Sequence, residues 1–363
     1  MTAPDLWELG CYGLAGHSDS PRDLVEEARA AERLGIGALF LSERFNVKEA
    51  ATLSGAVGAV TERLGVATAA TNHNTRHPLL TATFATTMHR LTGGRFALGL
   101  GRGFDMLFDV MGLPRVTQAQ LEDVIGILRT LWRGEPVMGH DGPAGRFPYL
   151  MQDSSFDEDI PIMMVAMGER TLEFAGSVAD GVVLHTFFTD EALARAVEAV
   201  RRGAEKAGRD PASVRMWSVL AVVGDHIPEE LRLKKLTGRL ATYLQGYGDL
   251  LVRLNRWDPT VLTRFRADDL VSGFPGAFDA IATTEQLERV TELLPAEWLA
   301  ASATGSPERC AARVLDQFEA GADGVILHGA TPAELEPVLT AYRTVRPVGF
   351  GVRTDLNPAR SIR

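Results

Sequence analysis

Residues 30–44 of the chain read AAERLGIGALFLSER. They predict the end of an amphipathic helix over residues 21–34, a stop at Gly35, and an apolar strand over residues 37–42. Glycine is the residue that most readily takes the left-handed conformation at a helix end. A strand that is apolar throughout is typical of a parallel sheet covered on both faces. Because this unit of helix, turn and apolar strand recurs along the chain, we expect an α/β fold.

Eight apolar strands are predicted, separated by helices. The strands are expected at residues 7–14, 37–42, 64–70, 95–100, 161–166, 181–185, 214–223 and 324–328. Eight strands that alternate with helices favour a closed (β/α)8 TIM barrel over an open, Rossmann-type doubly wound sheet. Barrels of this kind reach the present length as one unit, so residues 1–363 are expected to form a single domain.

Two stretches interrupt the alternation. Residues 134–159 are polar and rich in glycine and proline, and we expect a loop over the mouth of the barrel. Residues 226–304 are too long for one strand-to-helix connection, and they contain helical patterns. We expect this segment to be an insertion after the seventh strand rather than a second domain. Long excursions of this kind are typical of lids and binding loops.

Composition and charge exclude several classes of protein. The 363 residues include 37 Lys and Arg against 47 Asp and Glu, a formal net charge of −10, which opposes a nucleic-acid or membrane-surface partner. No apolar run approaches the roughly 18 residues of a transmembrane helix. Residues 1–5 lack the charged and apolar pattern of a signal peptide, so a cytoplasmic protein is expected. Two cysteines, Cys11 and Cys310, are too few for a disulfide scaffold or a Cys-rich zinc site.

The candidate binding residues follow directly after predicted strands, because barrels bind ligands at the carboxyl ends of their strands. Glu43 follows the second strand, and it suits either the polar edge of a bound ring or an ion pair at the rim. Gly101 and Gly103 flank Arg102 after the fourth strand. Glycines let a backbone approach a planar or anionic ligand closely, although a strand that runs into a turn gives the same pattern.

A second candidate is the turn after the fifth strand. Ala166, Met167 and Gly168 lead into a helix that starts at Glu169. Free N–H groups and the positive end of the helix dipole suit a phosphate at such a turn. An ordinary capped helix explains the same residues, so both interpretations stay open.

The histidines do not form a metal-binding pattern. His73 and His77 are four residues apart, but they lack the glutamate of a zinc-protease motif and fall in a predicted loop, so no metal is expected. His185 and His328 end two strands, where substrate contact and simple capping of the barrel are both open. The chain has no G-x-S-x-G motif and no phosphate-binding Walker loop, which counts against hydrolase and phosphotransfer chemistry.

Taken together, these segments resemble the bacterial luciferase-like monooxygenase superfamily. The resemblance rests on the order and spacing of residues 30–44, 71–78 (TNHNTRHP) and 91–103 (LTGGRFALGLGRG), with residues 164–168 and 306–328 adding to it. Within that superfamily, residues 71–78 look most like the branch that uses the deazaflavin coenzyme F420, in particular methylenetetrahydromethanopterin reductase. The resemblance implies a barrel that binds F420, or alternatively FMN, and a homodimer.

The resemblance also implies roles for particular residues. The F420 branch carries a bulge with a non-prolyl cis peptide after its third strand, which here would fall at Ala69–Ala70. This bulge would back the central ring of the cofactor, and the acidic residue at its polar edge would match Glu43. The residues that the resemblance assigns to the cofactor are Glu43, Ala69, Ala70, Thr71, Asn72, Gly101, Arg102, Gly103, Ala166, Met167, Gly168 and Glu169.

The chain departs from one neighbouring branch. The sugar-phosphate dehydrogenases have a histidine and a glutamate where this chain has Arg44 and Phe104, which argues against sugar-phosphate oxidation. No catalytic acid or base is therefore assigned, and His73, Asp105 and His185 are the candidates.

Three functions follow as hypotheses. The first is an F420-dependent oxidoreductase that transfers a hydride between the deazaflavin and an organic small-molecule substrate. The second is an FMN-dependent monooxygenase that uses reduced flavin and oxygen. The third is a non-catalytic flavin-binding barrel.

Overall fold

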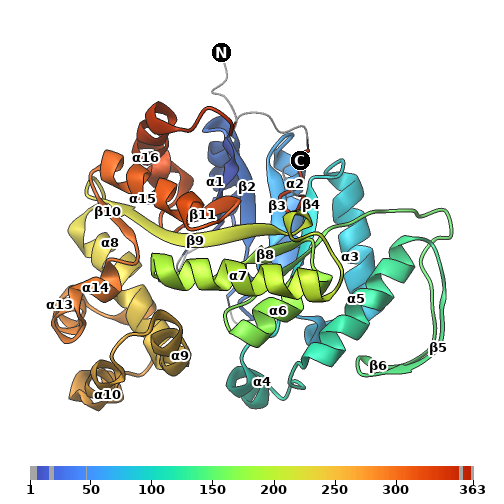
Figure 1. Cartoon of the computed structure of the whole chain (residues 1–363), viewed down its shortest axis with the longest axis horizontal. Coiled ribbons are helices and arrows are strands. Elements are labelled where there is room, and N and C mark those ends of the chain that lie inside the picture. Colours follow the sequence, from blue (N-terminus) through green and yellow to red (C-terminus); the bar gives the residue numbers. More distant parts are fainter. Residues whose placement is uncertain (1–5, 16–19, 46, 351–354, 361–363) are drawn as a thin grey trace. The chain divides into compact units, whose positions relative to one another are not determined.

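The computed structural model describes residues 6–15, 20–45, 47–350 and 355–360. The chain divides into two compact units, and each is assembled from separate stretches of sequence. Unit 1 comprises residues 1–36, 184–198 and 216–352, and unit 2 comprises residues 37–183, 199–215 and 353–363. Eight of the parallel strands alternate with helices along the chain, so the predicted (β/α)8 barrel is confirmed (Figure 1). The single domain over residues 1–363 stays a prediction.

Unit 2 is built on five parallel strands in the order β2-β3-β4-β7-β8. The strands are β2 (Ile36–Leu41), β3 (Gly65–Thr68), β4 (Phe96–Gly101), β7 (Ile162–Val165) and β8 (Gly181–Val183). β2, β3 and β4 are buried along their whole length, as expected of apolar strands covered on both faces.

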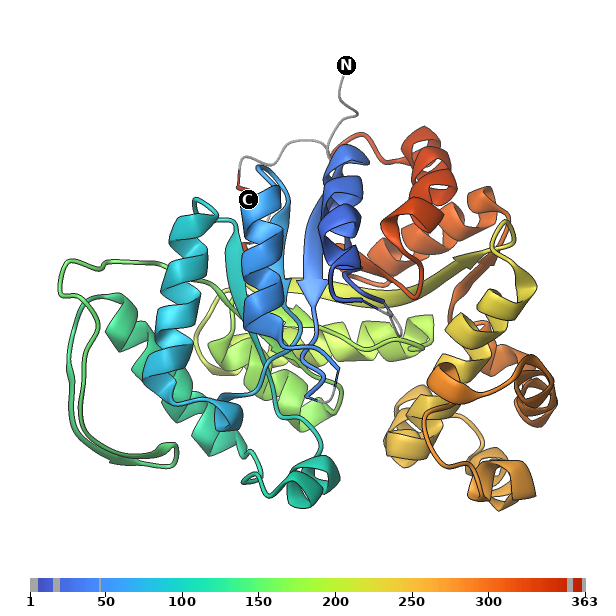
Figure 2. The same cartoon turned by 180° about the vertical axis from the view of Figure 1, so that it is seen from behind.

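The helices of unit 2 explain that coverage. They are α2 (Ala50–Val60), α3 (Pro78–Leu91), α5 (Gln118–Trp132) and α6 (Glu169–Val178), with the short turns η1 (His73–Thr75) and η2 (Pro211–Ser213). α2 contacts β3 and α3 contacts β4 (Figure 2). Trp132 of α5 is buried and donates its indole N–H to the carbonyl of Ala82 in α3 at 3.2 Å, so the helix layer is tied together by a satisfied aromatic side chain.

Unit 1 holds the remaining strands in the order β10-β9-β11-β1. They are β1 (Leu6–Tyr12), β9 (Arg215–Gly224), β10 (Ala303–Gly305) and β11 (Gly324–His328). The helices beside them are α1 (Asp23–Arg33), α15 (Pro307–Glu319) and α16 (Pro332–Val345). α7 (Asp190–Lys206) has residues in both units.

The predicted insertion after the seventh strand is present and helical. It starts after β9 and consists of α8 (Glu229–Leu233), the π-helical turn η3 (Lys234–Gly238), α9 (Arg239–Asn255), α10 (Pro259–Ala267), α11 (Asp269–Ser272), α12 (Phe278–Ile281), α13 (Thr284–Leu293) and α14 (Ala296–Leu299). These helices gather at one end of unit 1 in Figure 2, where they are yellow to orange. No helix in the described ranges is long and apolar enough to cross a membrane.

The expectation of a plain loop over residues 134–159 is wrong in part. β5 (Val137–Gly142) and β6 (Gly145–Leu150) form an antiparallel hairpin that extends from its unit (Figure 1). Most residues of this hairpin are exposed or half-buried on both faces. Its sequence therefore has no apolar run from which strands could be predicted. α4 (Asp105–Met111) was also not predicted, since it is short and exposes Met106 and Val110.

The C-terminal residues 355–360 complete unit 2. Asn357 is 2% exposed, and its side-chain amide donates to the carbonyls of Phe96 and Gly94. The carbonyl of Leu356 lies so close to Gly65 that a Cβ there would meet it at 2.7 Å. The end of the chain therefore packs against the amino ends of β3 and β4. The N-terminal residues 1–5, on which the prediction of no signal peptide rests, lie outside the described residues.

Candidate functional site

The carboxyl ends of β3, β4 and β7 lie side by side in unit 2 and carry most of the predicted site residues. Gly101 of β4 is in register with Val165 of β7, and Thr71 forms a parallel bridge to Leu100. The Ala69–Ala70 peptide bond is cis, as the resemblance implied. The Ala69 N–H donates to the carbonyl of Leu41, and the Ala70 carbonyl accepts from the N–H of Glu43.

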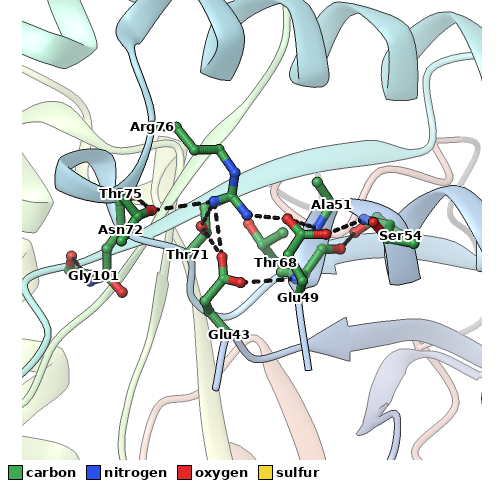
Figure 3. A network of polar contacts seen from close by, with 12 residues as sticks. Glu43, Glu49, Ala51, Ser54, Thr68, Thr71, Asn72, Thr75, Arg76 and Gly101 are labelled. Atoms are coloured by element: carbon green, nitrogen blue, oxygen red, sulfur yellow. Dashed lines mark hydrogen bonds and ion pairs between the residues drawn. The ribbon is translucent and has the colours of Figure 1, made fainter. Parts of the chain in front are cut away.

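Glu43 lies at the centre of a network of polar contacts (Figure 3). Its side chain is only 3% exposed. One carboxylate oxygen accepts the N–H of Ala50 at 3.1 Å, at the start of α2. The other accepts the hydroxyl of Thr71 at 2.6 Å and the guanidinium of Arg76 at 3.0 Å. Glu43 therefore joins the loop after β2, the start of α2 and the loop after β3, and any contact with a ligand would add to these bonds.

Arg76 and Glu49 complete this network, which we call the ion network (Glu43, Glu49, Thr71 and Arg76). Arg76 pairs with Glu43 through one nitrogen and contacts Glu49 through the other. Burial opposes the charge of Arg76, but Glu43 and Glu49 outweigh burial and raise its pKa. Burial also opposes the charge of Glu49 and by itself raises its pKa. The N–H groups of Thr52 and Ala51 together with Arg76 outweigh this effect and lower the pKa overall. Opposite charges thus compensate one another inside the network.

Small residues form the surface next to this network. A Cβ on Gly101 would meet the Cβ of Ala70 at 3.1 Å, so the two backbones approach closely. Gly103 has a φ of +69°, which only glycine adopts readily, and a side chain there would collide with Phe108. Asn72 is buried and donates its side-chain amide to the carbonyl of Gly101 at 2.8 Å. Glycine at these two positions therefore leaves room for Ala70 beside Gly101 and for the ring of Phe108 beside Gly103.

The N-terminus of α6 follows β7 in the same unit. Gly168 is the N-cap residue, and no side chain caps the helix. A Cβ on Gly168 would meet nothing within 4 Å, so the helix start faces open space. Glu169 in the first turn pairs with Arg202 at 2.7 Å, which offsets its charge. Uncapped N–H groups and the helix dipole make this start suitable for an anion.

The remaining predicted residues of unit 2 lie at the edge of this surface. Arg102 donates to the carbonyl of Val116 at 2.9 Å and lies 3.8 Å from the carboxylate of Asp105, whose side chain is 42% exposed. The Nε2 atom of His73 is buried and has no hydrogen-bond partner within the described part of the chain. Burial lowers the pKa of His73, so its neutral form is favoured.

Unit 1 contains a second group of side chains, also at strand ends. This aromatic–histidine cluster consists of Tyr12, His185, Phe187, Phe188, Tyr243, Tyr247 and His328. Tyr12 ends β1 and His328 ends β11, and their rings lie 5.2 Å apart, edge to face. The rings of Tyr243 and Tyr247 lie 5.0 and 5.2 Å from the ring of His185.

The hydrogen bonds of His185 fix its tautomer. Its Nδ1 atom lies 2.8 Å from the carbonyl of Thr186, which only accepts, so this nitrogen carries the proton. The Nε2 atom is then the acceptor for the hydroxyl of Tyr247 at 2.9 Å. Burial lowers the pKa of His185 to about 4, against the smaller opposing effect of the Thr186 carbonyl. The imidazole is therefore neutral near pH 7.

Sequence reasoning missed Arg76, Glu49, Tyr243 and Tyr247. Arg76 lies inside the quoted stretch 71–78, but nothing in the sequence indicates that it pairs with carboxylates 27 and 33 positions away. Tyr247 carries one local signal, since it stands between Gly246 and Gly248 inside α9 and has a non-helical backbone conformation. A tyrosine between two glycines marks an interrupted helix.

The fold is a (β/α)8 barrel, and small residues lie at the carboxyl ends of β3 and β4. The chain belongs to the luciferase-like monooxygenase family, whose model matches residues 5–324. This confirms the resemblance stated from the sequence.

Individual relatives give more detail. A 5,10-methylenetetrahydromethanopterin reductase of Methanolobus tindarius is 26% identical over 315 residues, or 85% of this chain and 90% of the relative. An F420-dependent glucose-6-phosphate dehydrogenase of Kribbella flavida is 26% identical over 345 residues. The alignment covers 88% of this chain and 91% of that relative. A coenzyme F420 dependent tetrahydromethanopterin reductase from Methanopyrus kandleri has the same fold, with a TM-score of 0.77, 19% identity, and 95% and 100% of the two chains covered.

Proposed function

We propose that the chain is an F420-dependent oxidoreductase that transfers a hydride between the deazaflavin and an organic substrate. The observation that carries the proposal is the continuous edge of small residues at the ends of β3, β4 and β7, which leads to the open start of α6. The family supports it, as do relatives whose names include F420.

The residues present fit such a cofactor. Ala69 and Ala70 with Gly101 would lie against the ring system, since none of them projects a bulky group. Gly168 and the first N–H groups of α6 would hold the phosphate. Glu43 would keep the loop ends in position through Thr71 and Arg76. A deazaflavin, when bound, supplies hydride chemistry rather than oxygen activation, because carbon replaces the reactive ring nitrogen.

For proton transfer we favour His185 over His73 and Asp105. The hydroxyl of Tyr247 donates a hydrogen bond to the Nε2 atom of His185 at 2.9 Å. Because Nε2 carries no proton, it could accept the proton of the Tyr247 hydroxyl while that hydroxyl takes one from a substrate, as general base catalysis requires. The side chain of Asp105 is instead 42% exposed beside Arg102, and the Nε2 atom of His73 has no hydrogen-bond partner among the described residues.

The second candidate is an FMN-dependent monooxygenase, because the matching family model describes a luciferase-like monooxygenase. A non-catalytic flavin-binding barrel predicts cofactor binding without turnover. Titrating the protein separately with F420 and with FMN, and following the quenching of cofactor fluorescence, distinguishes the first two. Tight FMN binding without a response to F420 would reject our proposal. The homodimer stays a prediction.

Two matched variants test the phosphate position. Asp and Asn are equally good N-cap residues, so Gly168→Asp and Gly168→Asn should both fold with α6 intact. Only the aspartate adds a negative charge where we expect the phosphate. We therefore expect F420 affinity to fall roughly tenfold, ~1.4 kcal/mol, in Gly168→Asp and to change little in Gly168→Asn. An equal loss in both variants would contradict this position.

A further inference from the structure

A cavity of about 420 Å³ lies in unit 1, and none of the residues assigned to the cofactor lines it. Its wall is formed by the end of β9, the strand β10, the start of α15 and the insertion helices α8, α13 and α14. The lining residues with apolar side chains are Val223, Leu233, Leu236, Ala296, Leu299 and Ala300. Cavities of this size accommodate small organic molecules, and a mainly apolar wall favours an apolar body.

The π-helical turn η3 shapes one side of this cavity. α8, η3 and α9 follow one another without a break, so a single turn of π-helix interrupts an otherwise α-helical segment. Leu236 and Thr237 of this turn line the cavity. The hydroxyls of Thr237 and Thr291 form a hydrogen bond with each other at 3.0 Å, so each of these polar groups in the wall has a partner. Single π-helical turns inside α-helices occur frequently at functional sites.

Two arginines supply the charge. Arg232 and Arg309 both line the cavity, and neither guanidinium has an ion pair or hydrogen bond among the described residues. Arg232 is half-buried, and its Nε atom is buried without a partner. The one carboxylate in the lining, Glu229, is exposed and pairs with neither arginine. Arg309 is exposed, but the half-buried guanidinium of Arg232 is charged without an opposite charge beside it, so an anion in the cavity would stabilise it.

We propose that this cavity binds a small organic acid, with its carboxylate on Arg232 and Arg309 and its apolar body against Leu233, Leu236 and Leu299. The guanidinium matches a carboxylate through paired N–H groups. On a chain with a net charge of −10, two unpaired cations next to apolar side chains select for an anion. This inference is independent of the proposed hydride transfer.

The test uses 4-phenylbutyrate as the probe and its uncharged amide as the matched ligand, with binding to the full chain measured by calorimetry. We expect the acid to bind at least about tenfold more tightly than the amide, and its affinity to fall with added salt. Arg232→Met should reduce acid affinity about tenfold, and Arg309→Met, at an exposed position, less. Arg264→Met, at an exposed arginine of α10 outside the lining, is the control and should bind as the parent does.

Two further measurements keep the proposal falsifiable. Because Arg232 has no partner to lose, Arg232→Met should unfold at no lower urea concentration than the parent. Ala300→Trp fills the cavity from an exposed position and should abolish binding of acid and amide alike. Equal binding of acid and amide would overturn the proposal, as would no binding of either probe or an equal loss in Arg264→Met.

Discussion

The ion network and the aromatic–histidine cluster both lie at carboxyl ends of strands, yet they are built on opposite principles. In the ion network, Glu43 and Glu49 face one guanidinium, Arg76, and every partner is charged or donates a strong hydrogen bond. In the cluster, rings surround a neutral His185 that has one hydroxyl and one carbonyl as partners. The first group fixes the loops that carry the small-residue surface. The second keeps a neutral, hydrogen-bonded pair of polar side chains among aromatic rings, which avoids the cost of burying a charge.

The largest expected effect is on the ion network. Glu43→Ala removes the acceptor for Ala50, Thr71 and Arg76 at once. Breaking a buried pair by removing one partner costs about 4 kcal/mol, so the free energy of unfolding in urea should fall by that amount. Glu26→Ala is the control, because its pair with Arg29 is exposed and should contribute little. A similar small loss in both variants would mean that the network does not fix the loops.

The second prediction concerns pH and the cluster. The folded chain holds the pKa of His185 at about 4, below the unfolded value of about 6.5, so the unfolded state binds more protons between these values. The resulting stability is fully present above pH 6.5 and is lost as pH falls toward 4. Its maximum is about 3 kcal/mol.

His185→Asn should remove this contribution, so its urea-unfolding free energy should depend less on pH between 6.5 and 4 than that of the parent. His226, which is exposed, provides the control variant His226→Asn, whose curve should keep the parent's shape. Parallel curves for parent and His185→Asn would show that the histidine is not held neutral by the fold.

The smallest effect is expected for the tyrosines. Tyr247→Phe leaves the Nε2 atom of His185 without its donor and should cost about 1 kcal/mol of unfolding free energy. Tyr243→Phe is the matched control, since Tyr243 contacts His185 through its ring alone and the ring is retained. Equal losses would show that the hydrogen bond from Tyr247 to His185 adds no more stability than the hydroxyl of Tyr243, and would weaken the case for His185 in proton transfer.

The two regions also differ in how far the sequence reveals them. All eight barrel strands were predicted, because buried parallel strands are apolar on both faces and stand between clear turn signals, as in β2 and β4. Glu43 was found as a candidate because it directly follows such a strand. Its partners were not, since an ion pair between residues 33 positions apart has no local pattern.

Elements without a buried face escaped prediction for a related physical reason. The hairpin of β5 and β6 exposes Met138 and Tyr149, so hydrophobic periodicity does not report it. Inside the insertion, the π-helical turn η3 and the non-helical Tyr247 shift the helical repeat twice, which blurs the pattern from which α8 and α9 could be delimited. Both difficulties arise where tertiary context, rather than local preference, decides the conformation.

The contact of Asn357 with Phe96 and Gly94 has a consequence for biosynthesis. Residues 37–215 are synthesised well before residues 355–360. The carbonyls of Gly94 and Phe96 therefore lack the side-chain amide of Asn357 as their donor until the insertion and the strands β10 and β11 have been translated. Unit 2, although encoded mostly by residues 37–215, is therefore completed only after residues 216–352 of unit 1 have been synthesised.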